Sequence, residues 1–506
     1  MDSHNVSRMP HLHREGDRIR LIVDGEPRVL LAGEVHNSSS SSLTYMERSW
    51  DRMVEIGCDT ALVPVSWEQI EPEEGRFDFV VLDGLLAGAR EHGLRLVLLW
   101  FGTWKNASSS YAPAWVKRNL ARFPRAQVEP GVNKDAITCL SRDAREADAR
   151  AFAALMGHLR AVDEGTHTVL AVQVENETGL LGGARDRCAL AEAAYRAPVD
   201  LALSAHLLQH REDLVPELMT AWTSSGARAE GTWPEVFGEI AAEAFMAWQV
   251  GSFVGAVAAA GKAEYALPMY ANAWLRGPGQ APGVYPSGGP LPWVRDLWQA
   301  AAPSIDFLAP DIYLPAFRDI CAEYRWPGNP LFIPEAAIAV APATVFHALA
   351  GADALCFAPF GIDGEFDWGP LQETYRFLRG MLPVILEYQG TGRMVGLLQE
   401  REAFQSFELG GYRLTARFHR SPEAPGLPGR GLVVALGEGN FLVAGADLDL
   451  SLEPRSAAVG QVEFLRIEEG TYEDGRWVPG RWLNGDELHL RLGPELCARR
   501  FSVFLR

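Results

Sequence analysis

Ala171-Val172-Gln173-Val174-Glu175-Asn176-Glu177 is an apolar run that ends abruptly in an amide between two carboxylates. Its β-branched residues predict a short buried strand over residues 169–174. Side chains two apart in a strand point to the same side, so we expect Glu175 and Glu177 to share a face unless the chain already turns there. A second run, Pro330-Leu331-Phe332-Ile333-Pro334-Glu335, also ends in a glutamate. Two acids at two strand ends predict a facing pair.

Strand and helix patterns alternate through the first three quarters of the chain. Eight predicted strands end near residues 34, 65, 100, 174, 270, 313, 335 and 360, and helical spacing follows most of them. An Ala-rich helical insertion is expected at about residues 180–260. Eight such units predict a (β/α)₈ TIM barrel over residues 16–385. Because all strand carboxyl ends open onto one face of a barrel, acids that end the fourth and seventh strands meet across its mouth.

The two ends of the chain have different patterns. Residues 1–15 are polar and are expected to be a disordered tail, and residues 18–31 predict a hairpin that leads into the first barrel strand. Past residue 390 the period becomes alternating, with expected hairpin turns at residues 437–440 and at Asn484-Gly485. The chain is therefore expected to end in an antiparallel β-sandwich domain over residues 390–506.

Composition narrows the class of function. With 506 residues, a net charge of −19 and no basic cluster, the chain lacks the surface that nucleic-acid binding requires. Residues 1–20 contain no apolar signal segment, and no run reaches about 18 apolar residues, so we expect no membrane segment and a cytoplasmic location, or a periplasmic or secreted one if a signal peptide has been removed. Six scattered cysteines read as buried thiols. His11 and His13 have no third ligand nearby, so neither a metal nor another cofactor is expected, and a homo-oligomer is compatible with the sequence.

A facing pair of acids suits the hydrolysis of a glycoside. One carboxylic acid protonates the departing oxygen, and the other carboxylate attacks the anomeric carbon when the two groups lie near ~5.5 Å apart. For the pair Glu177 and Glu335, the competing interpretation is a structural ion pair at the start of a loop.

Three motifs resemble those of glycoside hydrolase family 35 β-galactosidases, especially bacterial members with a C-terminal β-sandwich. Gln173 to Gly179 is similar to QxENExG, in which the Asn contacts the sugar 2-hydroxyl and the following Glu is the acid/base. Residues 33–36 are similar to the strand-one GxxH motif, and residues 67–79 to WxxxEPxxGxFDF. The resemblance implies Glu177 as acid/base and Glu335 as nucleophile. Asn37, Thr178 and residues 100–106 differ from the family pattern around the sugar pocket, so the resemblance implies the chemistry more directly than the sugar.

Further polar and aromatic residues at strand ends are candidate substrate contacts, each also open to a purely structural role. Asn176 is placed to donate to the 2-hydroxyl, and Tyr313 to hydrogen-bond the nucleophile. Tryptophans at strand ends can stack on a sugar face, and other polar groups at the same rim can bind hydroxyls. The remaining candidates are Trp104, Trp274, Trp368, Lys105, Glu34, His36 and Asn272.

The sequence thus predicts a retaining, exo-acting β-galactosidase whose substrate is a small or oligosaccharide galactoside. The same mechanism on an α-L-arabinopyranoside or a β-fucoside is an alternative. A non-hydrolytic sugar-binding scaffold is the alternative from another class.

Overall fold

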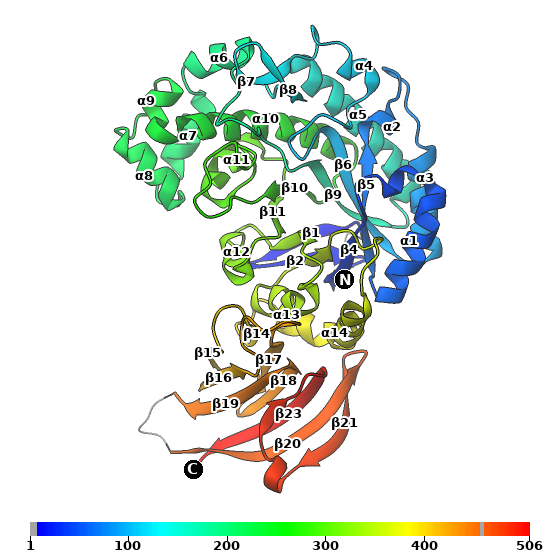
Figure 1. Cartoon of the computed structure of the whole chain (residues 1–506), viewed down its shortest axis with the longest axis vertical. Helices are drawn as coiled ribbons and strands as arrows, with labels where there is room; N and C mark the ends of the chain where they lie inside the picture. Colours follow the sequence, from blue (N-terminus) through cyan, green and yellow to red (C-terminus); the bar gives the residue numbers. More distant parts are fainter. Residues whose placement is uncertain (1–7, 456–459) are drawn as a thin grey trace, which may run out of the picture.

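The computed structural model describes residues 8–455 and 460–506, and its larger part is a closed barrel of eight parallel strands (Figure 1). The strand order around the barrel is β10-β11-β12-β13-β4-β5-β6-β9, which confirms the predicted TIM barrel. The strands are β4 (Leu30–Glu34), β5 (Thr60–Ser66), β6 (Arg95–Lys105), β9 (Val169–Asn176), β10 (Met269–Trp274), β11 (Phe307–Ile312), β12 (Phe332–Ala336) and β13 (Cys356–Pro359).

A helix follows each barrel strand and buries an apolar face against the outside of the barrel. In α1, Ser42 accepts a hydrogen bond from the Tyr45 amide at the start, and Gly57 ends the helix with a φ of 95°. Met46, Trp50 and Met53 lie on its buried face. The outer helices are α1 (Leu43–Ile56), α3 (Val80–Glu91), α5 (Arg142–Asp163), α10 (Ala241–Glu264), α11 (Arg295–Ala301), α12 (Phe317–Glu323), α13 (Ala341–Gly351) and α14 (Gly369–Tyr388).

The expected N-terminal tail is wrong for its last residues. His11–Glu15 forms β1, which pairs antiparallel with β2 (Arg18–Val23), and β2 pairs in turn with β3 (Glu26–Arg28). The pairing satisfies the backbone of β1, and Leu12 packs against the apolar interior of the barrel. Residues 1–7 lie outside the described part of the chain.

Two long connections elaborate the barrel. After β6 come α4 (Ala114–Lys117) and the hairpin of β7 (Arg125–Glu129) and β8 (Val132–Ile137). After β9, the expected helical insertion contains α6 (Ala189–Arg196), α7 (Leu201–Gln209), α8 (Pro216–Ser224) and α9 (Trp233–Phe237) before α10. The run from Trp233 to Glu264 is long and apolar enough to cross a membrane, yet 72% of its most apolar window is buried inside the protein, as befits a core helix.

The C-terminal domain is a β-sandwich, as predicted. A six-stranded sheet (β14-β17-β18-β23-β20-β21) and a four-stranded sheet (β15-β16-β19-β22) enclose a separate apolar core. The domain lies beneath α13 and α14 in Figure 1. Its strands are β14 (Met394–Leu398), β15 (Phe404–Leu409), β16 (Tyr412–Phe418), β17 (Arg430–Gly437), β18 (Asn440–Ala446), β19 (Leu448–Pro454), β20 (Val462–Glu473), β21 (Arg476–Leu483), β22 (Leu490–Leu492) and β23 (Cys497–Leu505).

One of the two expected hairpins is present. Residues 437–440 join β17 to β18, which are antiparallel neighbours. Asn484-Gly485 does not make a hairpin, because β21 pairs with β20 in the larger sheet whereas β22 pairs with β19 in the smaller one. The segment passes from one sheet to the other, so the pairing across the sandwich overrides the local turn preference.

Candidate active site

Four carboxyl groups from four barrel strands meet at the carboxyl-terminal mouth of the barrel. Glu34 ends β4, Glu177 follows β9, Asp311 lies near the end of β11, and Glu335 lies near the end of β12. All four residues are buried, with at most 6% of their surface exposed. We call Glu34, Glu177, Asp311 and Glu335 the carboxyl cluster. Its strand-end position is the one at which TIM barrels place their chemistry.

The end of β9 separates its two glutamates. Glu175 and Glu177 both have positive φ values, 62° and 44°, which break the alternation of a regular strand. The Glu175 carboxylate accepts hydrogen bonds from the backbone amides of Thr103 (3.1 Å) and Trp104 (2.6 Å). The chain thus already turns at the end of β9, so Glu175 and Glu177 do not share a face as they would in a regular strand, and only Glu177 enters the mouth.

Glu177 and Glu335 face each other closely. One carboxylate oxygen from each, and one from Asp311, all lie within 4.8 Å of one another. Burial, and next the negative charge of Glu335, raise the pKa of Glu177 to about 7, although Lys105 acts in the opposite direction. Glu177 thus holds a proton near neutral pH and can give it to a departing group.

Glu335 is oriented by two donors. The Tyr313 hydroxyl donates to Glu335 Oε2 over 2.6 Å, and the Asn176 side-chain amide donates to Oε1 over 3.4 Å. Burial and the adjacent Glu335 charge raise the pKa of Tyr313, so its proton stays on the phenol and remains available for donation. These two hydrogen bonds hold the Glu335 carboxylate in one orientation.

Lys105 and Asn272 fix the neighbouring groups. Lys105 Nζ donates to Asn176 Oδ1 over 2.9 Å and so turns the Asn176 amide nitrogen toward Glu335. Asn272 Oδ1 accepts from the Glu177 backbone amide (3.0 Å), and its Nδ2 donates to Asp311 Oδ2 (2.7 Å). One amide side chain therefore ties the acid to Asp311.

Asp311 is the site residue that the sequence reasoning missed. Burial first, and then the charges of Glu335, Glu177 and Glu34, raise its pKa well above the usual range. One carboxyl oxygen of Asp311 lies within 4.8 Å of an oxygen of Glu177, and Asp311 Oδ1 makes no hydrogen bond to any described residue, so the close approach of these buried acids favours a proton on one of them. Its signal was present in the sequence, because Asp311 is also an acid near the end of an apolar strand, two residues before Tyr313.

Glu34 lies in the same cluster with neither carboxyl oxygen bonded to any described residue. Burial, and next the Glu335 charge, raise its pKa well above the usual range. A buried carboxyl group without partners is costly, which indicates that a bound ligand supplies the missing hydrogen bonds.

Four candidate aromatic and histidine contacts lie outside this cluster. Trp104 is 2% exposed, donates to the Ile137 carbonyl and packs on Phe253, so the expected sugar contact is wrong: the side chain belongs to the core outside the barrel. His36 points to Asp363, 2.8 Å away, at the rim. Trp274 is 39% exposed at the end of β10, and Trp368 is largely buried, with its indole donating to Gly364.

The cluster also limits what else this site can hold. Within residues 8–455 and 460–506, Glu177, Asp311 and Glu335 form the one group of acidic, histidine or cysteine side chains close enough to share a metal ion. Their oxygens suit a hard cation. A cation there would draw the proton from Glu177, so the same three groups cannot bind a metal and donate a proton at once.

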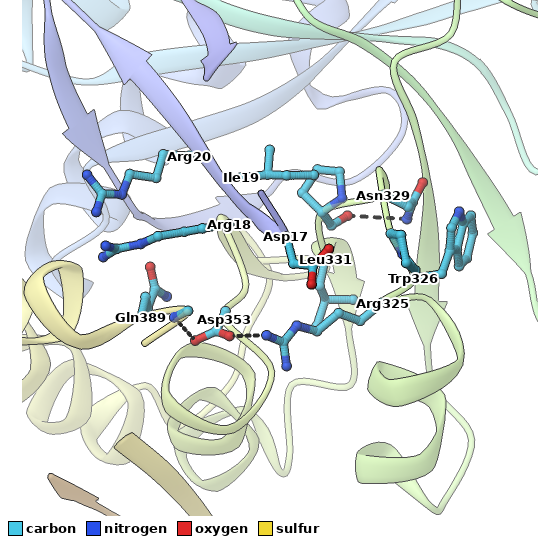
Figure 2. A pocket seen from close by; sticks show the side chains of 13 residues that line it. Asp17, Arg18, Ile19, Arg20, Arg325, Trp326, Asn329, Leu331, Asp353 and Gln389 are labelled. Atoms are coloured by element: carbon cyan, nitrogen blue, oxygen red, sulfur yellow. Dashed lines mark hydrogen bonds and ion pairs between the residues drawn. The ribbon is translucent and has the colours of Figure 1, made fainter. Parts of the chain in front are cut away.

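A cavity of about 260 Å³ lies at the amino-terminal face of the barrel, opposite the carboxyl cluster (Figure 2). We call it the floor cavity. Arg18 and Arg20 of β2 line it, together with Gln389 and the ion pair of Arg325 with Asp353. Gln389 donates to the backbone carbonyls of residues 349 and 354, so its amide joins the end of α14 to the barrel. No member of the carboxyl cluster lines this cavity.

Two family models match the chain. Residues 37–225 match the glycoside hydrolase family 42 model, described as a beta-galactosidase, and residues 371–494 match a domain of unknown function, DUF5597. The first match, over residues 37–225, confirms the predicted enzyme class, that of a glycoside hydrolase. It does not support family 35 in particular, because the matched model is that of family 42. No curated protein matches the chain.

Solved structures with a similar fold include β-galactosidases and a mannanase. The β-galactosidase of Bacillus circulans sp. alkalophilus is 15% identical with a TM-score of 0.49, over 71% of this chain and 57% of that one. The Rahnella sp. R3 β-galactosidase is 17% identical with a TM-score of 0.47, over 74% and 58%. The Cryptopygus antarcticus β-1,4-D-mannanase is 12% identical with a TM-score of 0.43, over 74% and 95%. The chain thus covers less than two thirds of the length of these two β-galactosidases.

Proposed function

We propose that this protein is a retaining, exo-acting β-galactosidase that removes terminal β-D-galactosyl residues. The observation that carries the proposal is the close approach of Glu177 and Glu335. One carboxylate oxygen of Glu177 lies within 4.8 Å of one carboxylate oxygen of Glu335. Retaining glycosidases place their two carboxyl groups about 5–5.5 Å apart, whereas inverting ones leave about 6.5–9.5 Å for a water molecule. The close approach supports direct attack by a carboxylate.

The reaction proceeds in two displacements. The ionised Glu335 attacks the anomeric carbon while the bond from that carbon to the glycosidic oxygen breaks, and Glu177 passes its proton to the departing oxygen. Glu177, now ionised, takes a proton from water as the water oxygen attacks the anomeric carbon and displaces Glu335. The sum is one glycoside and one water converted to galactose and an alcohol, with both glutamates restored.

The surrounding groups are suited to the developing charge. Asn176, held by Lys105, lies beside Glu335 and can donate to the sugar 2-hydroxyl, a contact that strengthens as positive charge builds on the ring. Glu34 offers sugar hydroxyls two buried oxygens that bond to no described residue. The choice of galactose rests on the description of the family 42 model.

A panel of nitrophenyl glycosides tests the sugar, and NMR of the first product tests the stereochemistry. We expect hydrolysis of the β-galactoside at the highest kcat/KM, with β-galactose as the first anomer released. Faster hydrolysis of the α-L-arabinopyranoside or the β-fucoside would show that this other sugar, and not galactose, is the preferred substrate. Initial release of the α anomer would contradict the double displacement, and binding of sugar without turnover of any member would favour a non-hydrolytic scaffold.

A further inference from the structure

A groove of about 650 Å³ runs between the mouth of the barrel and the C-terminal sandwich. We call it the junction groove. Its barrel wall comes from the segments after β11 and β12, and its other wall from residues 398–402, which follow β14, and from Pro428. Figure 1 shows β14 and the segment after it rising beside α12 and α13. The volume lies within the range that holds ligands of several rings.

Tyr313 joins the groove to the carboxyl cluster. Its hydroxyl donates to Glu335, while the residue is 49% exposed and lines the groove. A molecule in the groove therefore lies one side chain away from the carboxylate that attacks. Glu34 and Lys105 do not line the groove and are buried polar groups at the mouth, which suit the terminal sugar.

The walls of the groove are built in place. Glu400 accepts a hydrogen bond from the Arg318 backbone amide of α12, over 3.2 Å, across the domain boundary. Gln399 donates to the Arg420 carbonyl and accepts from the Gly429 amide, so both ends of its amide are held within the sandwich. On the barrel wall, Ala316 adopts a left-handed φ of 66° just before α12. Such a strained residue persists where its surroundings hold it.

The chemistry of the lining suits a neutral chain of sugars. Pro315 and Val340, both exposed, give apolar surface against which the C–H faces of a sugar can pack. Arg401 and Glu402 are exposed at the opposite edge and make no side-chain hydrogen bond or ion pair with any described residue. The Arg401 guanidinium can donate to sugar hydroxyl groups, and the Glu402 carboxylate can accept from them.

We propose that the junction groove binds the leaving-group part of the substrate, and that this part is an oligosaccharide held in place by the C-terminal sandwich. The proposal rests on the proposed galactosidase function and extends it. It gives the sandwich a direct role, since residues 399–402 form one wall of the binding site. A small alcohol as leaving group would leave the groove empty.

The test compares two substrates and two double variants. Arg401→Ala/Glu402→Ala removes the polar edge of the groove, and Arg413→Ala/Glu453→Ala is the matched control, a pair of exposed opposite charges that face each other on β16 and β19. Two lost hydrogen bonds predict a kcat/KM about 10-fold lower on a galactose-terminated tetrasaccharide. Nitrophenyl β-galactoside, which is too short to fill the groove, is expected to stay within about 2-fold. The control is expected to change neither.

Equal losses on both substrates, or no loss on the tetrasaccharide, would overturn the proposal. Filling the groove by Ala339→Trp, on an exposed position, gives a second test with the same expected split. If the protein hydrolyses no glycoside, the galactosidase function fails, and calorimetric titration of the tetrasaccharide into Glu177→Gln decides the groove by itself. A Kd about 10-fold weaker after adding Arg401→Ala/Glu402→Ala supports the groove, whereas an unchanged Kd, or no binding to Glu177→Gln, overturns it.

Discussion

The mouth and the floor of the barrel differ in how their charged groups are arranged. At the mouth, four carboxyl groups are buried near the ammonium group of Lys105. At the floor, arginines outnumber acids, and Arg325 and Asp353 pair directly while remaining partly exposed. The floor therefore needs no proton to balance its charges, whereas the mouth cannot keep all four carboxyl groups ionised at once.

This difference distinguishes the mouth, which has the groups of an active site, from the floor, whose charged groups connect parts of the fold. Burial raises the pKa values of Glu34, Glu177 and Asp311 because hydration of the charged form is lost and the neighbouring charges repel. Burial of these carboxyl groups at the mouth therefore lowers the free energy of unfolding of the protein. The floor instead links β2, the end of α14 and the segments before β12 and β13.

Removing the proton donor is expected to have the largest effect. Glu177→Gln should lower kcat/KM on a galactoside with a poor leaving group by at least about 1,000-fold, the range of general acid catalysis. Glu365→Gln, an exposed glutamate on the loop after β13, is the control. With Glu177→Ala and an activated nitrophenyl substrate, azide should restore turnover, because it replaces the water that Glu177 activates. Absence of rescue would count against the acid/base role.

Glu177→Gln should also stabilise the folded protein at alkaline pH. The folded protein holds the Glu177 proton up to about pH 7, whereas the unfolded chain releases it near the ordinary value of 4.5. The free energy of unfolding contributed by this group is therefore complete below about pH 4.5 and is lost as the pH rises to 7. Glu177→Gln should gain roughly 3 kcal/mol relative to the wild type at pH 8, and little at pH 4.5. Urea unfolding at both values measures this, and an equal change at both would contradict the buried charge.

Two variants of Asp311 test whether its charge or its hydrogen bonds matter at the mouth. If Asp311 is protonated and donates to Glu177, Asp311→Asn keeps a donor for Glu177 and an acceptor for Asn272 and should retain activity within about 10-fold. Asp311→Ala leaves the buried Asn272 Nδ2 without its acceptor and should lose about 10- to 100-fold in kcat. Its alkaline limb of kcat/KM should also move to higher pH, since Asp311 lowers the pKa of Glu177. Equal loss in both variants would show that the Asp311 charge itself is required.

The floor is expected to give the smallest effect. Arg325→Ala removes the ion pair with Asp353, which is partly exposed, so the free energy of unfolding should fall by no more than about 1 kcal/mol. Because no member of the carboxyl cluster lines the floor cavity, kcat and KM should not change. A loss of activity without a loss of stability would link the two faces of the barrel.

The barrel could be predicted because each strand-helix unit carries its own local pattern. The strand ends also revealed Glu177 and Glu335, since acids after apolar runs stand out in a sequence. Asp311 carried the same signal and was overlooked in favour of its neighbour Tyr313.

The predictions that failed concern residues whose conformation or contacts depend on tertiary structure. Nothing in the sequence shows that Glu175 takes a left-handed conformation, which turns it toward the amides of Thr103 and Trp104. Trp104 follows a strand, as a sugar-stacking residue would, but its place against Phe253 depends on α10, far along the chain. Asn484-Gly485 has the composition of a hairpin turn, and only the packing of two sheets makes it a crossing.

A mechanism-based 2-deoxy-2-fluoro galactoside tests the central claim most directly. The fluorine slows the second displacement, so the sugar should accumulate on the attacking carboxylate, where mass spectrometry of peptides locates it. We expect one sugar per chain, attached to Glu335, and none after Glu335→Gln. A label on Glu177, Asp311 or Glu34, or turnover of galactosides with no covalent label at all, would contradict the assignment.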